Sequence, residues 1–221
     1  MKKKIAILGS TGSIGKSLIN ILKKDKKNIE ICLLTAHKNY KELFKQIQTF
    51  NVKNIIITDP NSYLKVKKLL KKRKINILSS LDALNKIFIK KKIDYTMSAI
   101  SGFSGLKPTL DIIKYSKTIA IANKESIICG WSLIKKKLKK YNTQFIPVDS
   151  EHFSIWSLIN KLSHNNIEKV FITASGGPFK NYPIKKFKSI TQKQALKHPS
   201  WSMGKKISID SATMMNKVFE I

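Results

Sequence analysis

The chain has 221 residues, 42% of them hydrophobic, which is enough for one large domain or two small ones with packed cores. Its apolar runs are far shorter than the roughly 20 residues of a membrane helix, and its two cysteines do not suggest a disulfide framework or a thiolate metal site. We therefore expect a globular cytoplasmic protein in which Cys32 and Cys129 are buried, inert thiols.

The formal net charge of +30 invites the hypothesis of nucleic-acid binding. Only Arg73 of the 43 basic residues is an arginine, however, and bidentate recognition of bases and phosphates favours the guanidinium group. The lysine runs also fall at the ends or on the solvent faces of amphipathic segments. The sequence therefore disfavours a nucleic-acid partner, and it predicts no membrane association.

The first two thirds of the chain alternate short apolar runs with segments of helical periodicity. Strands are predicted at residues 4–8, 29–35, 54–58, 75–78, 95–98, 118–122 and 144–148. Helices are predicted at residues 14–22, 40–50, 62–72, 81–88, 106–115 and 125–138. This alternation predicts an α/β domain over residues 1–148, with a Rossmann-like parallel sheet covered by helices on both faces.

The pattern is less regular after residue 148. A helix is predicted at 153–162, strands at 170–174 and 206–209, and a further helix from Ser211. We therefore expect a second, α+β catalytic domain over residues 149–221. Because the last helical pattern reaches Ile221 without a cap or a glycine, this domain is expected to be incomplete.

A glycine-rich turn joins the first predicted strand to the first predicted helix. Its glycines, Gly9, Gly12 and Gly15, would let the backbone approach a pyrophosphate at the helix N-terminus. The spacing is G-x-x-G-x-x-G and not the usual G-x-G-x-x-G, so the motif is moderately specific and a tight turn without a ligand is the alternative.

The end of the second strand distinguishes between the two nicotinamide cofactors. An acidic residue there would bind the ribose 2'-hydroxyl of NADH, whereas a cation accommodates the 2'-phosphate of NADPH. The sequence Ala36-His37-Lys38-Asn39 contains a lysine and no acid, which favours NADPH.

Polar residues also follow the last two strands of the predicted sheet. Asn123-Lys124-Glu125 stands where parallel sheets bind ligands, although a helix N-cap with a charged first turn explains the same residues. Asp149 and Glu151 could converge on a hard cation such as Mg2+ or Mn2+, and a capped helix start is again the alternative.

The second domain contains further candidate site residues. The loop from His198 to Gly204 carries Trp201 and Met203, which fit either a lid or a buried anchor. The segment from Ser211 to Lys217 offers hydroxyl, amide and ammonium groups for a phosphate at a helix start. Glu220 could add a third carboxylate to Asp149 and Glu151.

The order and spacing of these motifs resemble those of the 1-deoxy-D-xylulose 5-phosphate reductoisomerase family. The matching segments are residues 9–15, 122–126, 147–152, 175–179 and 198–220. The resemblance implies NADPH- and metal-dependent conversion of 1-deoxy-D-xylulose 5-phosphate to 2-C-methyl-D-erythritol 4-phosphate in non-mevalonate isoprenoid biosynthesis. It implies rearrangement by retroaldol cleavage and aldol rejoining on a metal-polarised substrate, followed by hydride transfer from NADPH.

The resemblance also implies a role for each matching residue. The NADPH-contacting positions would be Thr11, Gly12, Ser13, Ile14, His37, Lys38, Asn39, Asn123, Glu125 and Gly204. The metal, Mn2+ or Mg2+ with Co2+ as an alternative, would be held by Asp149, Glu151 and Glu220. The substrate would contact Lys124, Ser150, Glu151, Ser175, His198, Ser211, Asn216, Lys217 and Glu220, with Trp201 and Met203 on a covering loop. Lys124, Asp149, Glu151, His198 and Glu220 would take part in catalysis.

The chain departs from the family pattern in two respects. His37 stands where glycine is common, and Val218-Phe219 stands where glycine and leucine are common. Family members also continue into the rest of the catalytic domain and a C-terminal helical domain, and they are expected to be homodimers. A catalytically inactive, truncated NADPH-binding fragment is therefore the alternative interpretation.

Overall fold

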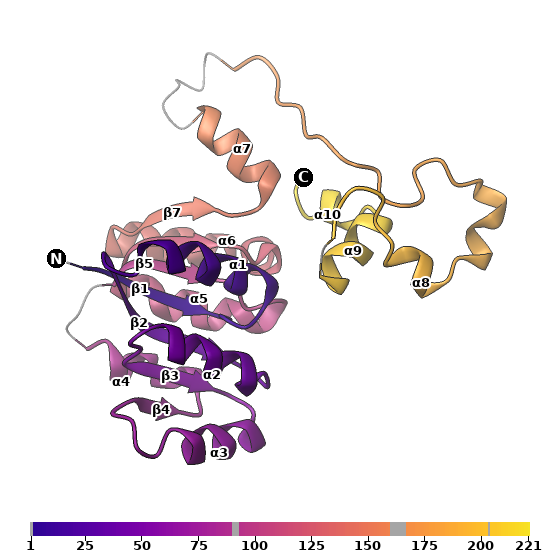
Figure 1. The fold of residues 1–221 in the computed structure, drawn as a ribbon. Coiled ribbons are helices and arrows are strands. Elements are labelled where there is room, and N and C mark those ends of the chain that lie inside the picture. The colour runs from indigo at the N-terminus through magenta and orange to yellow at the C-terminus, as the bar shows by residue number, and fades with distance from the viewer. Residues whose placement is uncertain (1, 90–92, 160–166, 203) are drawn as a thin grey trace. The chain divides into compact units, whose positions relative to one another are not determined.

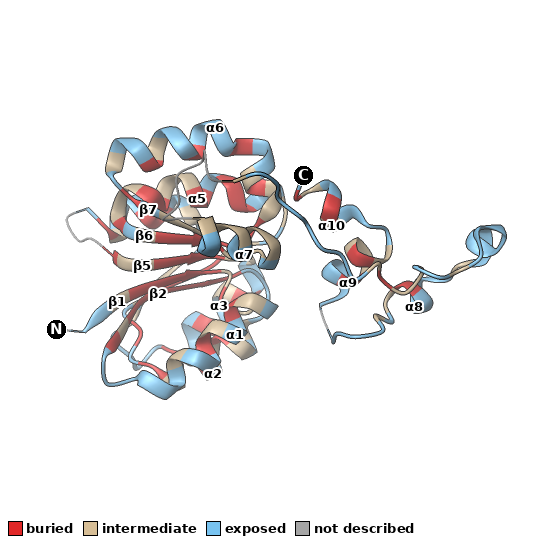
Figure 2. Cartoon of the chain, turned by 90° about the horizontal axis from the view of Figure 1, so that it is seen from above, coloured by how far each residue is buried: buried red, intermediate tan, exposed pale blue. Residues whose placement is uncertain are grey.

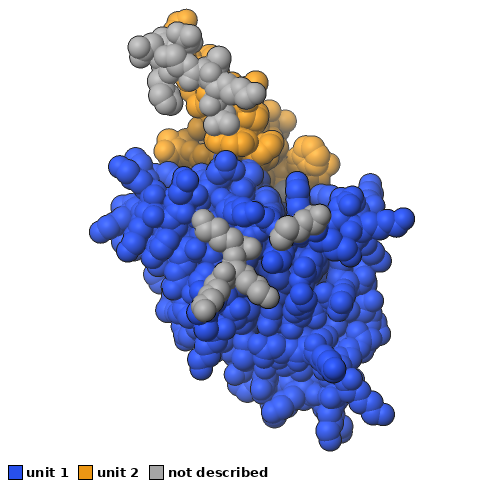
Figure 3. All heavy atoms as spheres, turned by 90° about the vertical axis from the view of Figure 1, so that its left-hand side faces the viewer, with its two compact units in different colours: residues 1–149 blue, residues 150–221 orange. Residues whose placement is uncertain are grey.

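The computed structural model describes residues 2–89, 93–159, 167–202 and 204–221 (Figure 1). The chain forms two compact units, Met1–Asp149 and Ser150–Ile221, which Figure 3 distinguishes by colour. Among the described residues, no helix is long and apolar enough to cross a membrane.

The first unit is built on a sheet of seven parallel strands in the order β4-β3-β2-β1-β5-β6-β7. The strands are β1 (Lys3–Leu8), β2 (Ile29–Ala36), β3 (Asn54–Ile57), β4 (Asn76–Leu78), β5 (Ile93–Ser98), β6 (Ser116–Ile121) and β7 (Gln144–Pro147). The order reverses direction between β1 and β5, which creates the switch point where open parallel sheets bind their ligands. The Rossmann-like sheet predicted from the sequence is confirmed.

Helices connect the strands and cover both faces of the sheet (Figure 2). They are α1 (Ser13–Leu22), α2 (Tyr40–Thr49), α3 (Pro60–Leu69), α4 (Leu84–Ile87), α5 (Leu106–Ile112) and α6 (Lys124–Tyr141). Short 3-10 turns are η1 (Lys23–Asp25), η2 (Leu81–Ala83), η3 (Phe103–Gly105) and η4 (Ile113–Tyr115). Helices α2, α3 and α6 begin where Asn39, Asp59 and Asn123 accept hydrogen bonds from the backbone of the first turn.

Two apolar cores separate the sheet from its helices. Alternate residues of β1 point to opposite faces: Ile5 and Ile7 pack in one core, and Ala6 and Leu8 in the other. The first core includes α1, α2 and α3, and the second includes α4, α5 and α6. Because both faces are covered, the central residues of most strands are apolar, as the sequence indicates.

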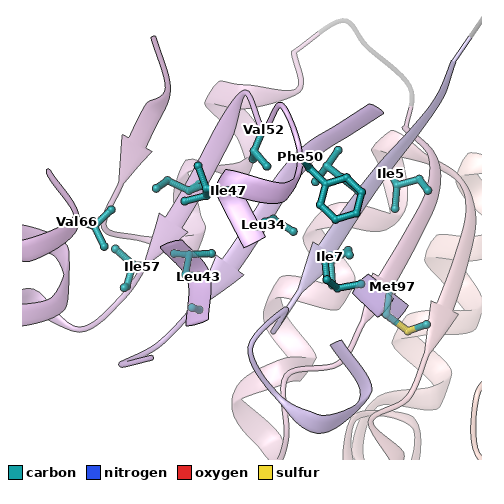
Figure 4. Packing of buried hydrophobic residues seen from close by; sticks show 14 of the residues in the cluster. Ile5, Ile7, Leu34, Leu43, Ile47, Phe50, Val52, Ile57, Val66 and Met97 are labelled. Atoms are coloured by element: carbon teal, nitrogen blue, oxygen red, sulfur yellow. The ribbon is translucent and has the colours of Figure 1, made fainter. Parts of the chain in front are cut away.

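Helix α2 shows how this packing fixes a layer. Leu43 and Ile47, one turn apart, are almost fully buried against β2 and β3 residues such as Leu34 and Ile57 (Figure 4). Truncating a buried isoleucine such as Ile47 to alanine is expected to cost about 2–5 kcal/mol. Helix α2 also supports the loop that follows β1, through a hydrogen bond from Gln46 to the Ser10 carbonyl.

The second unit contains helices and loops in its described part. Its elements are α7 (Ser150–Ile159), the 3-10 segment η6 (Ile184–Ser189), α8 (Gln192–Ala195), α9 (Lys205–Ala212) and α10 (Met215–Val218). Helix α7 begins before the predicted start at 153, and the predicted end at 162 lies outside the described residues.

Both strands predicted for the second unit are wrong. Residues 170–174 have no ladder partner among the described residues, so their apolar, β-branched composition is not sufficient to make a strand. Residues 206–209 lie in α9, where Ser208 and Ser211 are buried three residues apart and Lys206 pairs with Asp210 at 2.6 Å. The short alternation of lysine, isoleucine and serine is compatible both with the two-residue period of a strand and with the period of a helix.

Two further predictions need correction. The helix predicted from Ser211 is interrupted, because α9 ends at Ala212 and α10 ends at Val218, before the last residue. Cys32 is buried as predicted, but Cys129 is exposed. Helix α6 buries Ser126, Gly130, Ile134 and Leu138 at a spacing of four, and Cys129 lies off this stripe.

Candidate active site

The glycine turn after β1 lies at the switch point of the sheet. Gly9 has a φ of +78°, and a Cβ there would lie 2.7 Å from the carbonyl oxygen of Ala99, which follows β5. A Cβ on Gly15 would lie 2.4 Å from the carbonyl oxygen of Gly9. Glycine is therefore required at both positions, once for its conformation and once for the approach of α1 to the turn.

Two residues that the sequence did not point to hold this turn in place. Thr35 of β2 accepts hydrogen bonds from the backbone N–H of Gly9 at 2.8 Å, through Oγ1, and of Ser10 at 2.9 Å, through its carbonyl. Gln46 of α2 donates from Nε2 to the Ser10 carbonyl at 2.9 Å. Both Thr35 and Gln46 are polar residues inside apolar periodic segments, and this was the only feature of the sequence that could have indicated their role.

The N-terminus of α1 is suited to an anion. Its N-cap is Gly12, which offers no side chain, and its first turn carries no acidic residue. Ser13 is exposed, whereas Thr11 and Ile14 are partly buried. The backbone N–H groups of this first turn therefore have no side-chain cap, and the positive end of the helix dipole favours negative charge.

The residues after β2 lie on the surface of the first unit. His37, Lys38 and Asn39 are exposed; the Nδ1 of His37 lies 2.8 Å from Thr58 Oγ1, and Asn39 caps α2. Cys32, inside β2, is buried, unlike these three residues. Burial of its thiol raises the pKa of Cys32 to about 12.

Asn123 is a structural link as well as an N-cap. Its Oδ1 accepts from the backbone N–H of Ser126 at 3.0 Å, and its Nδ2 donates to the carbonyls of Ile100 and Gly102, the latter at 2.7 Å. The residue is 4% exposed. Its side chain thus ties the start of α6 to the loop after β5, in agreement with the capping interpretation.

The next residues bring two site candidates together. Lys124 Nζ lies 2.5 Å from the Asp149 carboxylate within the first unit, and Glu125 is partly buried beside it in the chain. Asp149 is the last residue of this unit, and Glu151 is the second residue of the next. Two residues of chain span at most about 7 Å, which limits the separation of the Cα atoms of Asp149 and Glu151.

In the second unit, two carboxylates share one ammonium group. The Nζ of Lys217 donates to Glu151 Oε1, to Glu220 Oε2 and, at 2.9 Å, to the carbonyl of Thr173. Burial alone lowers the pKa of Lys217, but its hydrogen bonds to Glu151 and Glu220 outweigh that effect and raise the pKa. Ser150 Oγ donates to Glu151 Oε2 at 2.6 Å. The sequence suggested the carboxylates, but not that Lys217 joins them.

The remaining candidates of the second unit form two contacts. Ser175 Oγ lies 3.1 Å from His198 Nε2, and a Cβ on Gly177, which has a φ of +63°, would lie 2.5 Å from the carbonyl oxygen of Ser211. Ser211 lies near the end of α9, not at a helix start as predicted. The buried Oδ1 of Asn216 has no hydrogen-bond partner among the described residues.

The loop between α8 and α9 exposes its aromatic side chain. Trp201 is 63% exposed, so it is not a buried anchor within the described structure. Gly204 is the exposed N-cap of α9. Met203 lies outside the described residues.

Comparison with known families accounts for both units. A family model described as 1-deoxy-D-xylulose 5-phosphate reductoisomerase matches residues 5–130, and the model of that enzyme's C-terminal domain matches residues 145–221. The chain belongs to the 1-deoxy-D-xylulose 5-phosphate reductoisomerase family. The resemblance seen in the sequence is confirmed.

Individual members of the reductoisomerase family are similar over nearly the whole chain. The reductoisomerase of Pelagibacter ubique is 69% identical over 99% of this chain, which covers 57% of that protein. The reductoisomerase structure from Zymomonas mobilis in complex with NADPH is 36% identical, with a TM-score of 0.86, and the chain covers 56% of it. A reductoisomerase structure with NADPH, fosmidomycin and magnesium has a TM-score of 0.87 at 35% identity. The chain therefore spans slightly more than half the length of these relatives.

Proposed function

We propose that this chain is part of an NADPH- and divalent-metal-dependent oxidoreductase that rearranges and reduces 1-deoxy-D-xylulose 5-phosphate to 2-C-methyl-D-erythritol 4-phosphate for isoprenoid biosynthesis. The observation that carries the proposal is the shared ammonium of Lys217: Glu151 and Glu220, which are far apart in sequence, define one cation position. Relatives crystallised with NADPH and with magnesium support the same chemistry.

The first unit is proposed to bind NADPH. The turn at Gly9 and Gly15 leaves no room for a side chain, so the backbone itself would face the pyrophosphate at the start of α1. Lys38 would take the 2'-phosphate. The proposed contacts are Thr11, Gly12, Ser13, Ile14, His37, Lys38, Asn39, Asn123 and Glu125, with Gly204 from the second unit.

The metal is proposed to bind to three carboxylates, Asp149, Glu151 and Glu220. Carboxylate oxygens are the ligands preferred by Mg2+ and Mn2+, and the gathering of Glu151 and Glu220 around a cation fits such an ion; Co2+ is an alternative. When bound, the metal would polarise the substrate oxygens and NADPH would supply the hydride.

The substrate is proposed to contact polar residues of both units. Ser175 and His198 would hold it through the hydroxyl and imidazole that already contact each other, and the loop carrying Trp201 and Met203 would cover it and exclude water. The proposed substrate-binding residues are Lys124, Ser150, Glu151, Ser175, His198, Ser211, Asn216, Lys217 and Glu220.

The cellular setting is proposed from the family and the sequence. We expect a cytoplasmic homodimer at the full length of the relatives, with a small sugar phosphate as its partner and no nucleic-acid or membrane partner. We propose residues 1–148 as the cofactor domain and 149–221 as part of the metal and substrate domain.

NADPH oxidation with 1-deoxy-D-xylulose 5-phosphate and Mg2+ or Mn2+ tests the proposal. The assay is run on this chain and on a form extended to the relatives' length, each with Glu151→Gln as its control. Turnover that Glu151→Gln abolishes supports the proposal. Because the chain spans 57% of its Pelagibacter relative, a fragment that binds NADPH without turnover is the second candidate; activity of the extended form alone would support it. Silence from both forms would contradict the proposed reaction.

A further inference from the structure

The ammonium group of Lys217 has no capacity left for a substrate. A lysine has three N–H donors, and the three acceptors of Lys217 are Glu151, Glu220 and the Thr173 carbonyl. The residue is 8% exposed, so water does not substitute freely for these partners. Lys217 can donate to a phosphate only after it leaves at least one of its three acceptors.

Two of those acceptors belong to the proposed metal site. A divalent cation between Glu151 and Glu220 would stand beside the ammonium in a region where Glu220 is only 6% exposed. Two positive charges that share the same carboxylate partners repel each other strongly when water is largely excluded. The ammonium and the metal therefore compete for the same pair of carboxylates.

The third proposed metal ligand has the same kind of partner. Asp149 pairs with Lys124 at 2.5 Å, with the two side chains 8% and 21% exposed. Each of the three carboxylates thus pairs with a lysine that is also a candidate substrate ligand.

From these contacts we infer that Lys217 is a built-in counter-ion that occupies the cation position between Glu151 and Glu220, and that a divalent metal displaces it and so frees its ammonium for the anionic substrate. Lys124 plays the corresponding part at Asp149. The inference rests on the proposed function, and it adds an order of events: the metal binds before Lys217 engages the substrate phosphate.

The first test measures Mn2+ binding without NADPH or substrate, by the loss of the electron paramagnetic resonance signal of free Mn2+. Lys217→Met removes the competitor, so Mn2+ should bind about tenfold more tightly or better, because hydrogen bonds to charged groups no longer have to be broken. Lys206→Met is the matched control, since it removes one exposed lysine that pairs with Asp210 in the same unit, and it should leave the Mn2+ affinity unchanged.

The second test uses the unaltered protein, so it does not depend on the folding of a variant. Reductive methylation followed by peptide mass spectrometry measures how fast each lysine reacts. Lys217 should react several-fold faster when Mg2+ is present, while Lys206 should not change. An equal or slower rate for Lys217 with Mg2+ would overturn the inference.

The outcomes separate this inference from the proposed function. Mn2+ binding that Glu151→Gln removes, but that Lys217→Met does not tighten, would sink the counter-ion role and leave the metal site intact. No Mn2+ binding to the unaltered protein at any length would overturn both.

Discussion

The imidazole Nε2 of His198 lies 3.1 Å from the hydroxyl oxygen of Ser175. The other ring nitrogen, Nδ1, accepts from the backbone N–H groups of Ser200 and Trp201 at 3.1 and 3.0 Å. A neutral imidazole that accepts at Nδ1 carries its proton at Nε2, so His198 donates to Ser175. Ser175 also accepts from the Gly177 N–H at 3.3 Å, which leaves its own hydroxyl proton to donate to a ligand.

Two replacements of His198 separate these roles. His198→Asn keeps an acceptor near the Nδ1 position and should preserve the turn at Ser200 and Trp201, whereas His198→Gln keeps a donor near Nε2 and should lose the turn. We expect limited proteolysis between residues 198 and 204 to accelerate in His198→Gln and to change little in His198→Asn. On the proposed role of His198 in substrate binding, both should raise the KM for 1-deoxy-D-xylulose 5-phosphate in the extended form. Equal protease sensitivity of the two variants would argue against the assigned tautomer.

Gly15→Ala should damage the fold and the proposed cofactor site together. The added Cβ would meet backbone atoms of Gly9 and Ser10 at 2.4 to 2.6 Å, and overpacking of this kind costs about 1–3 kcal/mol. Thermal unfolding and NADPH fluorescence titration measure the two effects. Gly12→Ala is the control for the melting temperature only, because its Cβ would lie 3.5 Å from the Gly9 carbonyl and should cost less than about 1 kcal/mol. Similar melting temperatures for both variants would contradict this account.

Asn123→Asp tests whether Asn123 does more than cap α6. Aspartate is as good an N-cap as asparagine, but it cannot donate to the carbonyls of Ile100 and Gly102. Leaving such buried acceptors unpaired costs about 1–3 kcal/mol or more. Urea unfolding without cofactor should therefore show Asn123→Asp to be at least as destabilised as Asn123→Ala. Unchanged stability of Asn123→Asp would show that Asn123 contributes as an N-cap and that its hydrogen bonds to Ile100 and Gly102 do not stabilise the fold.

The two cysteines should differ in reactivity. With a pKa of about 12, about one in a thousand Cys32 side chains is a thiolate at pH 9 in the folded protein, and the residue is 7% exposed. Iodoacetamide should modify one thiol in the native protein and two in denaturant, and Cys129→Ser should abolish the native reaction. Rapid modification of both thiols in the native state would show that β2 is not enclosed as described.

The raised pKa of Cys32 should lower the free energy of unfolding in alkaline solution. Folding raises the Cys32 pKa from 9.0 to about 12, so its contribution is fully present below pH 9 and is lost as the pH rises toward 12. Relative to Cys32→Ala, the unaltered protein should lose about 1.4 kcal/mol of unfolding free energy for each pH unit above 9. Urea unfolding of both proteins at pH 8 and pH 10 measures this difference, and a constant difference would contradict the enclosed thiol.

The first unit could be predicted from the sequence because local and long-range signals agree there. The central residues of most strands are apolar because both faces of the sheet are covered. Capping residues such as Asn39 and Asn123 stand one residue before their helices. The glycine turn was equally readable, because close backbone approach at Gly9 and Gly15 permits no other residue.

The second unit was harder to predict, because its short segments carry conflicting periods. Residues 206–209 alternate like a strand, yet the pair of Lys206 and Asp210 and the buried Ser208 and Ser211 belong to a helix. The contacts of Lys217 with Glu151 and Thr173 join residues distant in sequence, which no local pattern reveals.

The most direct test of the proposed reaction identifies the product. The form extended to the relatives' length is incubated with 1-deoxy-D-xylulose 5-phosphate, Mg2+ and NADPH that carries deuterium at the transferable position. We expect 2-C-methyl-D-erythritol 4-phosphate containing one deuterium, and no such product from the Glu151→Gln variant. Recovery of unchanged substrate, or product formed equally well by Glu151→Gln, would contradict it.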